Sequence, residues 1–93
     1  MNLQMYSMHD AATGIFHKPI YQTTEKEALR TFSTTVNQPG SPMFNFPEHY
    51  DMYYLGEYDD NTGLMNCLPT PKFIAKAIQF RKEKEPIVQA VTQ

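Results

Sequence analysis

The stretch from Tyr50 to Leu68 constrains the fold more than any other part of this chain, because it has the pattern of two strands joined by a tight turn. Residues 52–58 are rich in tyrosine, which packs well on the pleated surface of a sheet. The link Asp-Asp-Asn-Thr-Gly at residues 59–63 consists of turn formers, and Gly63 can supply the positive φ of a bulged hairpin. Residues 64–68 should form the second strand and stop at Pro69, which cannot donate a hydrogen bond to a neighbouring strand.

The N-terminal part predicts a second hairpin. Residues 1–8 alternate between two sets of side chains, as in a strand, and residues 9–14 have the composition of a turn. A short strand at residues 15–18 should follow and end at Pro19.

One helix is expected between these hairpins, over residues 25–37. Thr24 and Glu27 have the spacing of a capping box, in which the threonine hydroxyl accepts a hydrogen bond from the N–H of Glu27. An apolar face follows at helical spacing, formed by Ala28, Leu29, Phe32 and Val36.

The C-terminal part leaves two alternatives open. Ile74, Ala77 and Ile78 share a helical face, whereas Ile74, Ile78 and Phe80 would share one face of a strand. The alanines, lysines and glutamine of residues 72–81 favour the helix. We therefore expect one α+β domain over residues 1–84, of order β-β-α-β-β plus a C-terminal helix or strand. Residues 85–93 should form a flexible tail.

Composition excludes several kinds of function. The chain has 93 residues, which is enough for one domain, and no apolar run approaches the roughly 18 residues of a membrane span. No N-terminal signal peptide is evident. The single cysteine, Cys67, excludes an intrachain disulfide and is expected to be a buried thiol. The three histidines lack metal-ligand spacing, and no phosphate loop or nucleophile motif is present, so we expect no metal, no cofactor and no enzyme.

Charge is distributed unevenly along the chain. Residues 1–70 carry three basic and eight acidic side chains, whereas residues 71–93 carry five basic and two acidic ones. A protein that coats duplex DNA without specificity would be far more basic. Strands that expose aromatic rings beside lysines can instead stack single-stranded bases. The candidate residues for binding nucleic acid are Lys18, Lys72, Lys76, Arg81, Lys82, Lys84, Tyr6 and Phe16.

The aromatic residues also have a structural interpretation, as the core of a small domain. The same holds for Phe44 and Phe46, which lie in a proline-rich loop. These two rings either cap the edge of the core or form a surface that binds a partner.

The order of several short segments resembles the small nonstructural protein of gokushovirus-like microviruses, which are tailless single-stranded DNA phages. The resemblance covers residues 3–78 and is most specific at residues 55–63, Leu-Gly-Glu-Tyr-Asp-Asp-Asn-Thr-Gly. Earlier segments are Met-Tyr-Ser-Met-His-Asp at residues 5–10, Phe-His-Lys-Pro at 16–19, Ala-Leu-Arg-Thr-Phe at 28–32 and Phe-Pro-Glu-His-Tyr at 46–50. The resemblance implies a non-enzymatic DNA-binding protein of the infected host cytoplasm that takes part in replication.

We therefore predict a phage protein that binds single-stranded DNA during genome replication or the switch to single-stranded genome synthesis. The alternative is an adaptor that binds the phage replication initiator, a scaffold component or a host factor. A sheet this small can bury a face or an edge against a second copy, so a homodimer is also expected.

Overall fold

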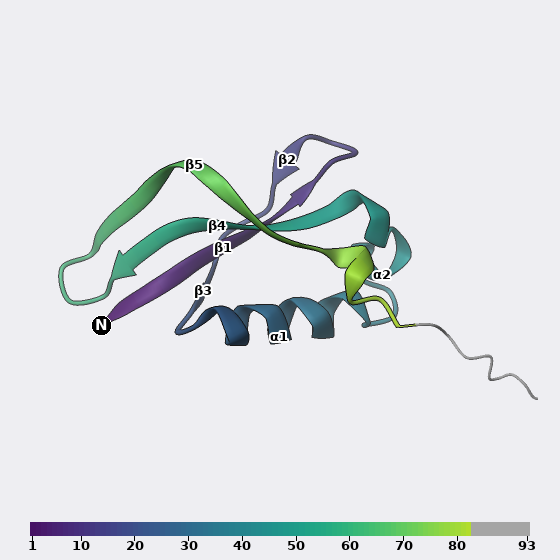
Figure 1. Ribbon diagram of the computed structural model, residues 1–93, viewed down its shortest axis with the longest axis horizontal. Coiled ribbons are helices and arrows are strands. Elements are labelled where there is room, and N and C mark those ends of the chain that lie inside the picture. The colour runs from purple at the N-terminus through teal and green to yellow at the C-terminus, as the bar shows by residue number, and fades with distance from the viewer. Residues whose placement is uncertain (83–93) are drawn as a thin grey trace, which may run out of the picture.

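The computed structural model describes residues 1–82, which form an α+β fold with one main helix and a curled antiparallel sheet of five strands (Figure 1). The strands are β1 (Asn2–Asp10), β2 (Ile15–Phe16), β3 (Ile20–Gln22), β4 (Tyr50–Asp59) and β5 (Leu64–Lys76). The main helix is α1 (Glu25–Val36), and the short elements are α2 (Pro42–Asn45), η1 (Pro47–His49) and η2 (Ala77–Gln79). The predicted tail at residues 85–93 lies outside the described residues.

The strand order is β2-β1-β4-β5, and β3 pairs with β1 on the same edge as β2. The predicted order of four strands was therefore one strand short. Pro19 interrupts the edge between β2 and β3, and the chain then returns to β1, where Tyr21 pairs with Met5. The buried Ser7 hydroxyl bridges this interruption by donating a hydrogen bond of 2.6 Å to the carbonyl oxygen of His17.

Helix α1 forms where the sequence predicts it. The Thr24 hydroxyl accepts a hydrogen bond of 3.2 Å from the N–H of Glu27, which confirms the predicted cap. Ala28, Phe32 and Val36 are completely buried against the sheet, and Leu29 is half-buried beside them. The sheet contributes to this core the side chains of Tyr6, Met8, Tyr50, Met52 and Ala75.

Strand β5 differs most from the expectation. It does not stop at Pro69, and residues 72–76 are strand rather than helix, with a single 3-10 turn at residues 77–79. Pro69 and Pro71 lie in a bulge of β5. Gly56 pairs with Cys67 and Tyr54 with Lys72, so residues 68–71 stand opposite Leu55 alone. Proline is tolerated in bulges of an edge strand, because no ladder hydrogen bond is required of it there.

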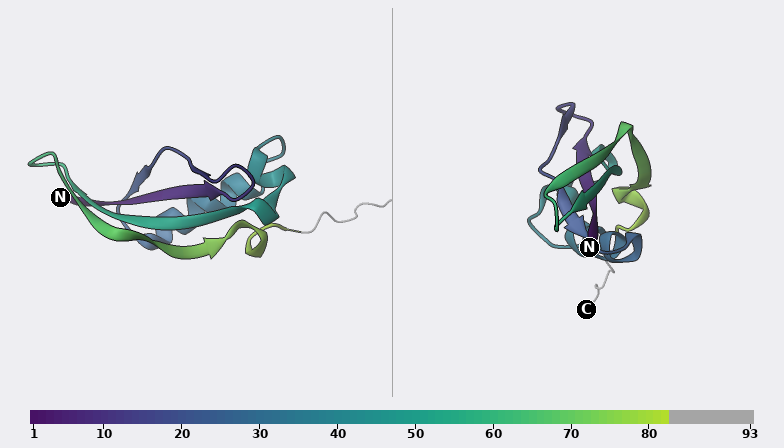
Figure 2. Two further views of the ribbon diagram at one scale, coloured as in Figure 1. Left: turned by 90° about the horizontal axis from the view of Figure 1, so that it is seen from above. Right: turned by 90° about the vertical axis from the view of Figure 1, so that its left-hand side faces the viewer.

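Gly56 allows β4 and β5 to approach each other closely beside this bulge. Its φ is +145°, and a Cβ atom at this position would lie 2.4 Å from the carbonyl oxygen of Asn66. The β1–β4 register shifts at the same place, between Met5 and Tyr6. The sheet bends here and extends beyond α1, as the views in Figure 2 show, so the described molecule is elongated, with extents of 58 × 27 × 18 Å.

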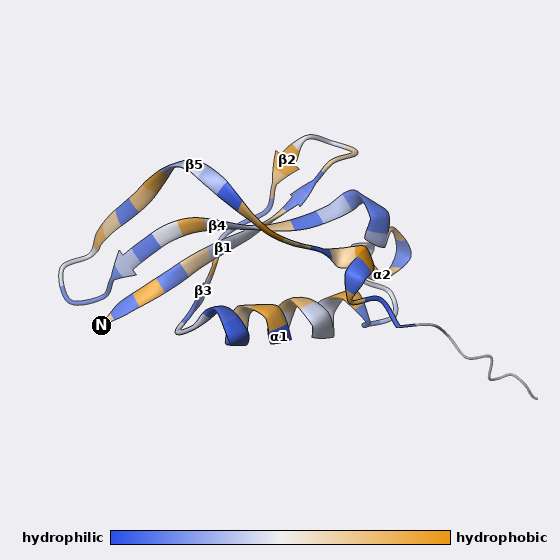
Figure 3. Cartoon of the chain, viewed as in Figure 1, coloured by the Kyte–Doolittle hydropathy of each residue, from blue (hydrophilic) through white to orange (hydrophobic). Residues whose placement is uncertain are grey.

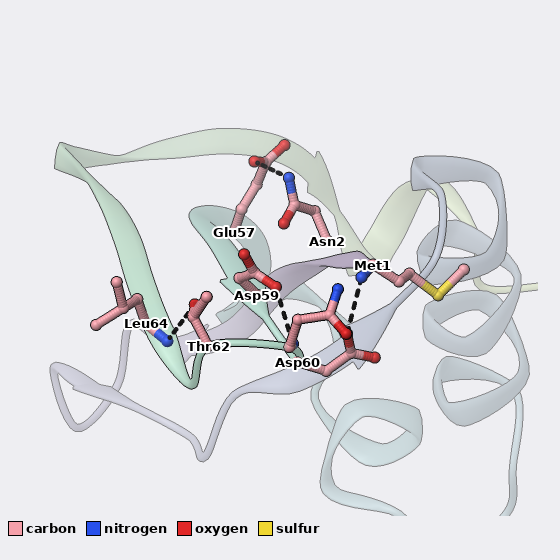
Figure 4. A network of polar contacts seen from close by, with 8 residues as sticks. Met1, Asn2, Glu57, Asp59, Asp60, Thr62 and Leu64 are labelled. Carbon is pink, nitrogen blue, oxygen red and sulfur yellow. Dashed lines mark hydrogen bonds and ion pairs between the residues drawn. The ribbon is translucent and has the colours of Figure 1, made fainter.

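The far end of the sheet, which we call the tip, is held by polar contacts instead of a helix (Figure 4). The N-terminal amino group lies 2.9 Å from a carboxylate oxygen of Asp60, and Asn2 donates a hydrogen bond of 3.4 Å to Glu57. Asp59 accepts a hydrogen bond from the N–H of Asn61 at 2.9 Å, and this bond lowers the pKa of the Asp59 carboxyl group. The tip is thus three strands wide, since β1 continues alongside the β4–β5 hairpin.

Replacement of Phe32 by alanine should reduce the free energy of unfolding by about 3–5 kcal/mol, because a fully buried ring would leave a cavity. Leu29→Ala should cost less, since Leu29 is only half-buried. Chemical denaturation measures both effects. Arg30→Ala, on the exposed side of α1, is the control and should change stability by no more than about 0.5 kcal/mol. Equal stability of all four proteins would contradict the helix-on-sheet core.

Gly56→Ala should destabilise the protein more than Gly14→Ala. Both glycines have positive φ, at +145° and +75°, but a Cβ atom at Gly14 would meet nothing within 4 Å. The control therefore reports backbone strain alone, a cost on the order of 1–3 kcal/mol, and the excess at Gly56 reports the steric clash with β5. Thermal melts of the two variants measure the difference, and similar melting temperatures would mean that the close approach has little importance.

Candidate nucleic-acid interface

The sheet face opposite α1 carries aromatic rings from four strands. Side chains of a strand alternate between the two faces, and directly paired residues share a face. Tyr6 and Met8 of β1 point towards α1, so Ser7 and His9 point to the opposite face. The register then places Phe16 beside His9, Tyr53 beside Ser7 and Phe73 beside Tyr53. We call Phe16, His9, Tyr53 and Phe73 the aromatic row.

The rings of the aromatic row form a continuous set of contacts. Centroid distances are 4.4 Å for His9 and Phe16, 5.4 Å for Phe16 and Tyr53, and 5.9 Å for Tyr53 and Phe73. The planes of His9 and Phe16 are tilted by 51°, and the two contacts of Tyr53 are edge-to-face at 67° and 80°, a geometry that aromatic pairs prefer. Phe16 and Phe73 are 43% and 46% exposed, so rings at both ends of the row are accessible from solvent.

Charged groups lie at the β5 end of the row. The ammonium group of Lys76 lies 5.9 Å from the ring centroid of Phe73, within the range of a cation–π contact. Asp51 pairs with His9 on one side and with Lys76 on the other, so it stands between the two basic groups in the register. Lys76 is exposed, whereas Asp51 is half-buried, so the cation is the more accessible charge.

Of the two aromatic residues singled out from the sequence, Phe16 belongs to the row and Tyr6 does not. Tyr6 is 1% exposed, its ring packs 5.2 Å from that of Tyr54, and its hydroxyl donates a hydrogen bond of 2.6 Å to Gln4. Burial raises the pKa of Tyr6 to about 12. The prediction that Tyr6 stacks a base was therefore wrong, because this side chain lies on the face that α1 covers.

The predicted basic residues are spread over several parts of the molecule. Lys72 is exposed on β5, but it pairs with Tyr54 and so lies on the same side of the sheet as Tyr6. Lys18 is exposed on the link between β2 and β3, at the opposite edge from β5. It borders an open cavity of about 590 Å³, whose apolar lining includes Met8 and Ile20.

The C-terminal basic residues lie beside α2 rather than at the row. The guanidinium of Arg81 lies 3.8 Å from the ring centroid of Phe44, and its Nε donates a hydrogen bond of 3.2 Å to the Phe44 carbonyl oxygen. Lys82 is exposed next to it, and Lys84 lies outside the described residues. Arg81 thus attaches the end of the described chain to α2.

The two phenylalanines of the proline-rich loop have different surroundings. Phe44 is half-buried under Arg81, whereas Phe46 is 52% exposed and stacks on His49 at 5.8 Å. Phe46 and His49 line a pocket of about 370 Å³ together with Asp10 and Pro42.

His9, Tyr53 and Phe73 were not singled out from the sequence as site residues. The helical interpretation of residues 72–81 hid Phe73, because a helix would not place it opposite Tyr53. The sequence itself does not indicate this arrangement, because Phe73 and Lys76 are three residues apart and share a face only if the strand contains a bulge. Ile74 is this extra residue: Met52 pairs with Ala75, and Tyr53 with Phe73.

The structure also bears on metal binding, on the environment of the single cysteine and on membrane spans. No group of three or more histidine, cysteine or acidic side chains within residues 1–82 is placed to hold a metal ion. Cys67 is exposed, contrary to the expected buried thiol, because it lies in the part of β5 that α1 does not reach. In the described part of the chain, no helix has the length and apolar character needed to cross a membrane.

Comparison with known protein families gives a match over most of the chain. The family model described as Phage ORF5 protein matches residues 3–80, which include the whole aromatic row and all of the five strands except Asn2 of β1. No curated protein and no solved structure matches the chain.

Proposed function

The chain belongs to the Phage ORF5 protein family, and we propose that it binds single-stranded DNA through the aromatic row. The observation that carries this proposal is the continuous set of four rings on the face of the sheet away from α1, with Lys76 at one end. Base–aromatic stacking is tolerant of sequence, because every base has a π face.

The row favours a single strand over a duplex. Bases in a duplex stack on one another and do not offer their faces to a protein, whereas bases of a single strand can lie on Phe16 and Phe73. The ammonium group of Lys76 is placed to contact a phosphate beside a base stacked on Phe73. Since the chain has a net charge of −2, stacking has to supply a large share of the affinity.

The biological setting that we propose rests on the resemblance to the microvirus protein. Phages with single-stranded DNA genomes need proteins that hold the single strand during genome replication or during the switch to single-stranded synthesis. We place this protein there, as a non-enzymatic binder in the host cytoplasm that acts as a homodimer and has no membrane partner.

The adaptor function has its own support. Phe46 is half-exposed on a pocket beside His49, which is a feature of surfaces that receive an apolar side chain from another protein. The phage replication initiator, a scaffold component or a host replication protein are the candidate partners. This alternative predicts no binding to oligonucleotides.

A fluorescence anisotropy titration tests the proposal with single- and double-stranded oligonucleotides at two salt concentrations. The wild-type protein should bind the single strand more tightly. Phe73→Ala should weaken this binding by about 1–3 kcal/mol, the value of one stacked base. Tyr21→Ala is the matched control, because Tyr21 is 44% exposed on the same face but contacts Tyr58 rather than the row.

The salt dependence tests the role of Lys76. Lys76→Gln should reduce the log–log slope by about 0.7, which corresponds to one phosphate of a single strand. Lys26→Gln, at an exposed position on α1, should leave the slope unchanged. If neither oligonucleotide changes the anisotropy at low salt, the protein does not bind DNA and the adaptor function becomes the better proposal.

A further inference from the structure

Strand β5 forms a long open edge of the sheet. It stands at the end of the strand order, and within residues 1–82 only β4 pairs with it. The opposite edge is covered by β2 and β3, which have two and three residues and are interrupted at Pro19. An open edge presents unpaired N–H and C=O groups that can pair with another strand.

The composition of this edge is unusual for one exposed to water. Residues 64–68, Leu-Met-Asn-Cys-Leu, contain no charged side chain and are all exposed, with Leu64 at 70% and Met65 at 59%. Figure 3 shows the hydrophobic colour on this part of β5, remote from α1. Proteins usually protect such an edge with lysine, proline or a bulge. Here the protection begins only at Pro69, so five residues remain free to pair.

We propose that a second copy of this chain pairs with this edge, with the two β5 strands antiparallel. The inference develops the homodimer proposed above and does not require DNA binding. The turn at residues 59–63 and the bulge at Pro69 bound the available segment, whose central residue is Asn66. A two-fold axis at Asn66 places Leu64 of each copy opposite Leu68 of the other, so apolar side chains meet across the new ladder.

Charges beyond the paired segment favour the same arrangement. Asn66, at the axis, pairs with Glu57 of β4. Along β4, Lys72 stands three residues to one side of Glu57, opposite Tyr54, and Asp60 stands three residues to the other side. The axis therefore brings Lys72 of each copy close to the acidic tip of the other, which carries Asp59 and Asp60 (Figure 4). A parallel pairing would instead place the two copies of Lys72 together. Charge thus selects the antiparallel self-association of two identical edges.

The arrangement also has a consequence for DNA binding. A two-fold axis that relates antiparallel strands of one sheet is perpendicular to that sheet, so both aromatic rows lie on the same side. One single strand of DNA could then contact both rows. Once it is bound to the first row, its effective concentration at the second row is high, which raises the overall affinity.

Five paired residues form a small interface, so we expect an equilibrium between monomer and dimer that depends on protein concentration.

Sedimentation equilibrium without DNA tests the proposal over a range of concentrations. The wild-type chain of 10.8 kDa should dimerise as concentration rises. Asn66→Lys places two lysines directly opposite each other and should weaken association by about tenfold, because like charges that face each other across an antiparallel pair repel. Ile15→Lys is the matched control: Ile15 is 61% exposed on β2, at the other edge, and this variant should dimerise like the wild type.

A disulfide cross-link tests the register. Asn66→Cys combined with Cys67→Ser should give a covalent dimer on mild oxidation, because directly opposite residues of an antiparallel pair have Cα atoms about 4.5–5.5 Å apart, within disulfide range. Ile15→Cys combined with Cys67→Ser should not cross-link. Circular dichroism verifies that every variant is folded.

Two results would overturn this interface. One is a wild-type protein that stays monomeric up to near-millimolar concentration. The other is a dimer that Asn66→Lys leaves intact and that Asn66→Cys does not cross-link. Oligonucleotide binding by the Asn66→Lys monomer separates this proposal from the proposed function, because its aromatic row remains complete.

Discussion

The close approach of β4 to β5 at Gly56 is the constraint on which the rest of this structure depends. Without a Cβ atom, the backbone can pass beside Asn66 and Cys67 at a positive φ that other residues avoid. The sheet bends at this point into a part that α1 covers and a tip that it does not. The aromatic row lies on the covered part, on the face away from α1, and the open edge of β5 lies at the tip.

A single helix of twelve residues explains why so many aromatic side chains stay accessible. Helix α1 covers one face of the sheet, so the rings of the other face pack mainly on one another, with Lys76 beside Phe73. Such edge-to-face contacts fix their positions but leave their outer surfaces open to solvent. An exposed patch of this kind is costly in water and is commonly retained for binding. Tyr6 and Tyr53 illustrate the division, since one lies under α1 and the other in the row.

Local signals predicted α1 and the β4–β5 turn, because the Thr24 cap and the run of turn formers act over a few residues. Signals that depend on pairing were missed. Alternation along β1 defines two faces, but it does not say which face meets α1, so Tyr6 was placed wrongly. The alanines, lysines and glutamine of residues 72–81 favoured a helix, whereas the bulges at Ile74 and at residues 68–71, which reset the alternation of β5, become visible only through its pairing with β4. Strand β3 was missed because three residues after a proline carry too little pattern.

The two proposals assign different roles to the lysines of β5. Lys72 and Lys76 are four residues apart, and the sequence alone groups them as contacts for one phosphate backbone. The bulge at Ile74 places them on opposite sides of the sheet, with Lys76 beside Phe73 and Lys72 beside Tyr54. Lys76 is then free to contact a phosphate at the aromatic row. Lys72 lies where the acidic tip of a second copy would be, and there it would favour dimerisation rather than DNA. An acidic chain can bind DNA in this way, because few cations are needed at the row when stacking supplies much of the affinity and two copies act together.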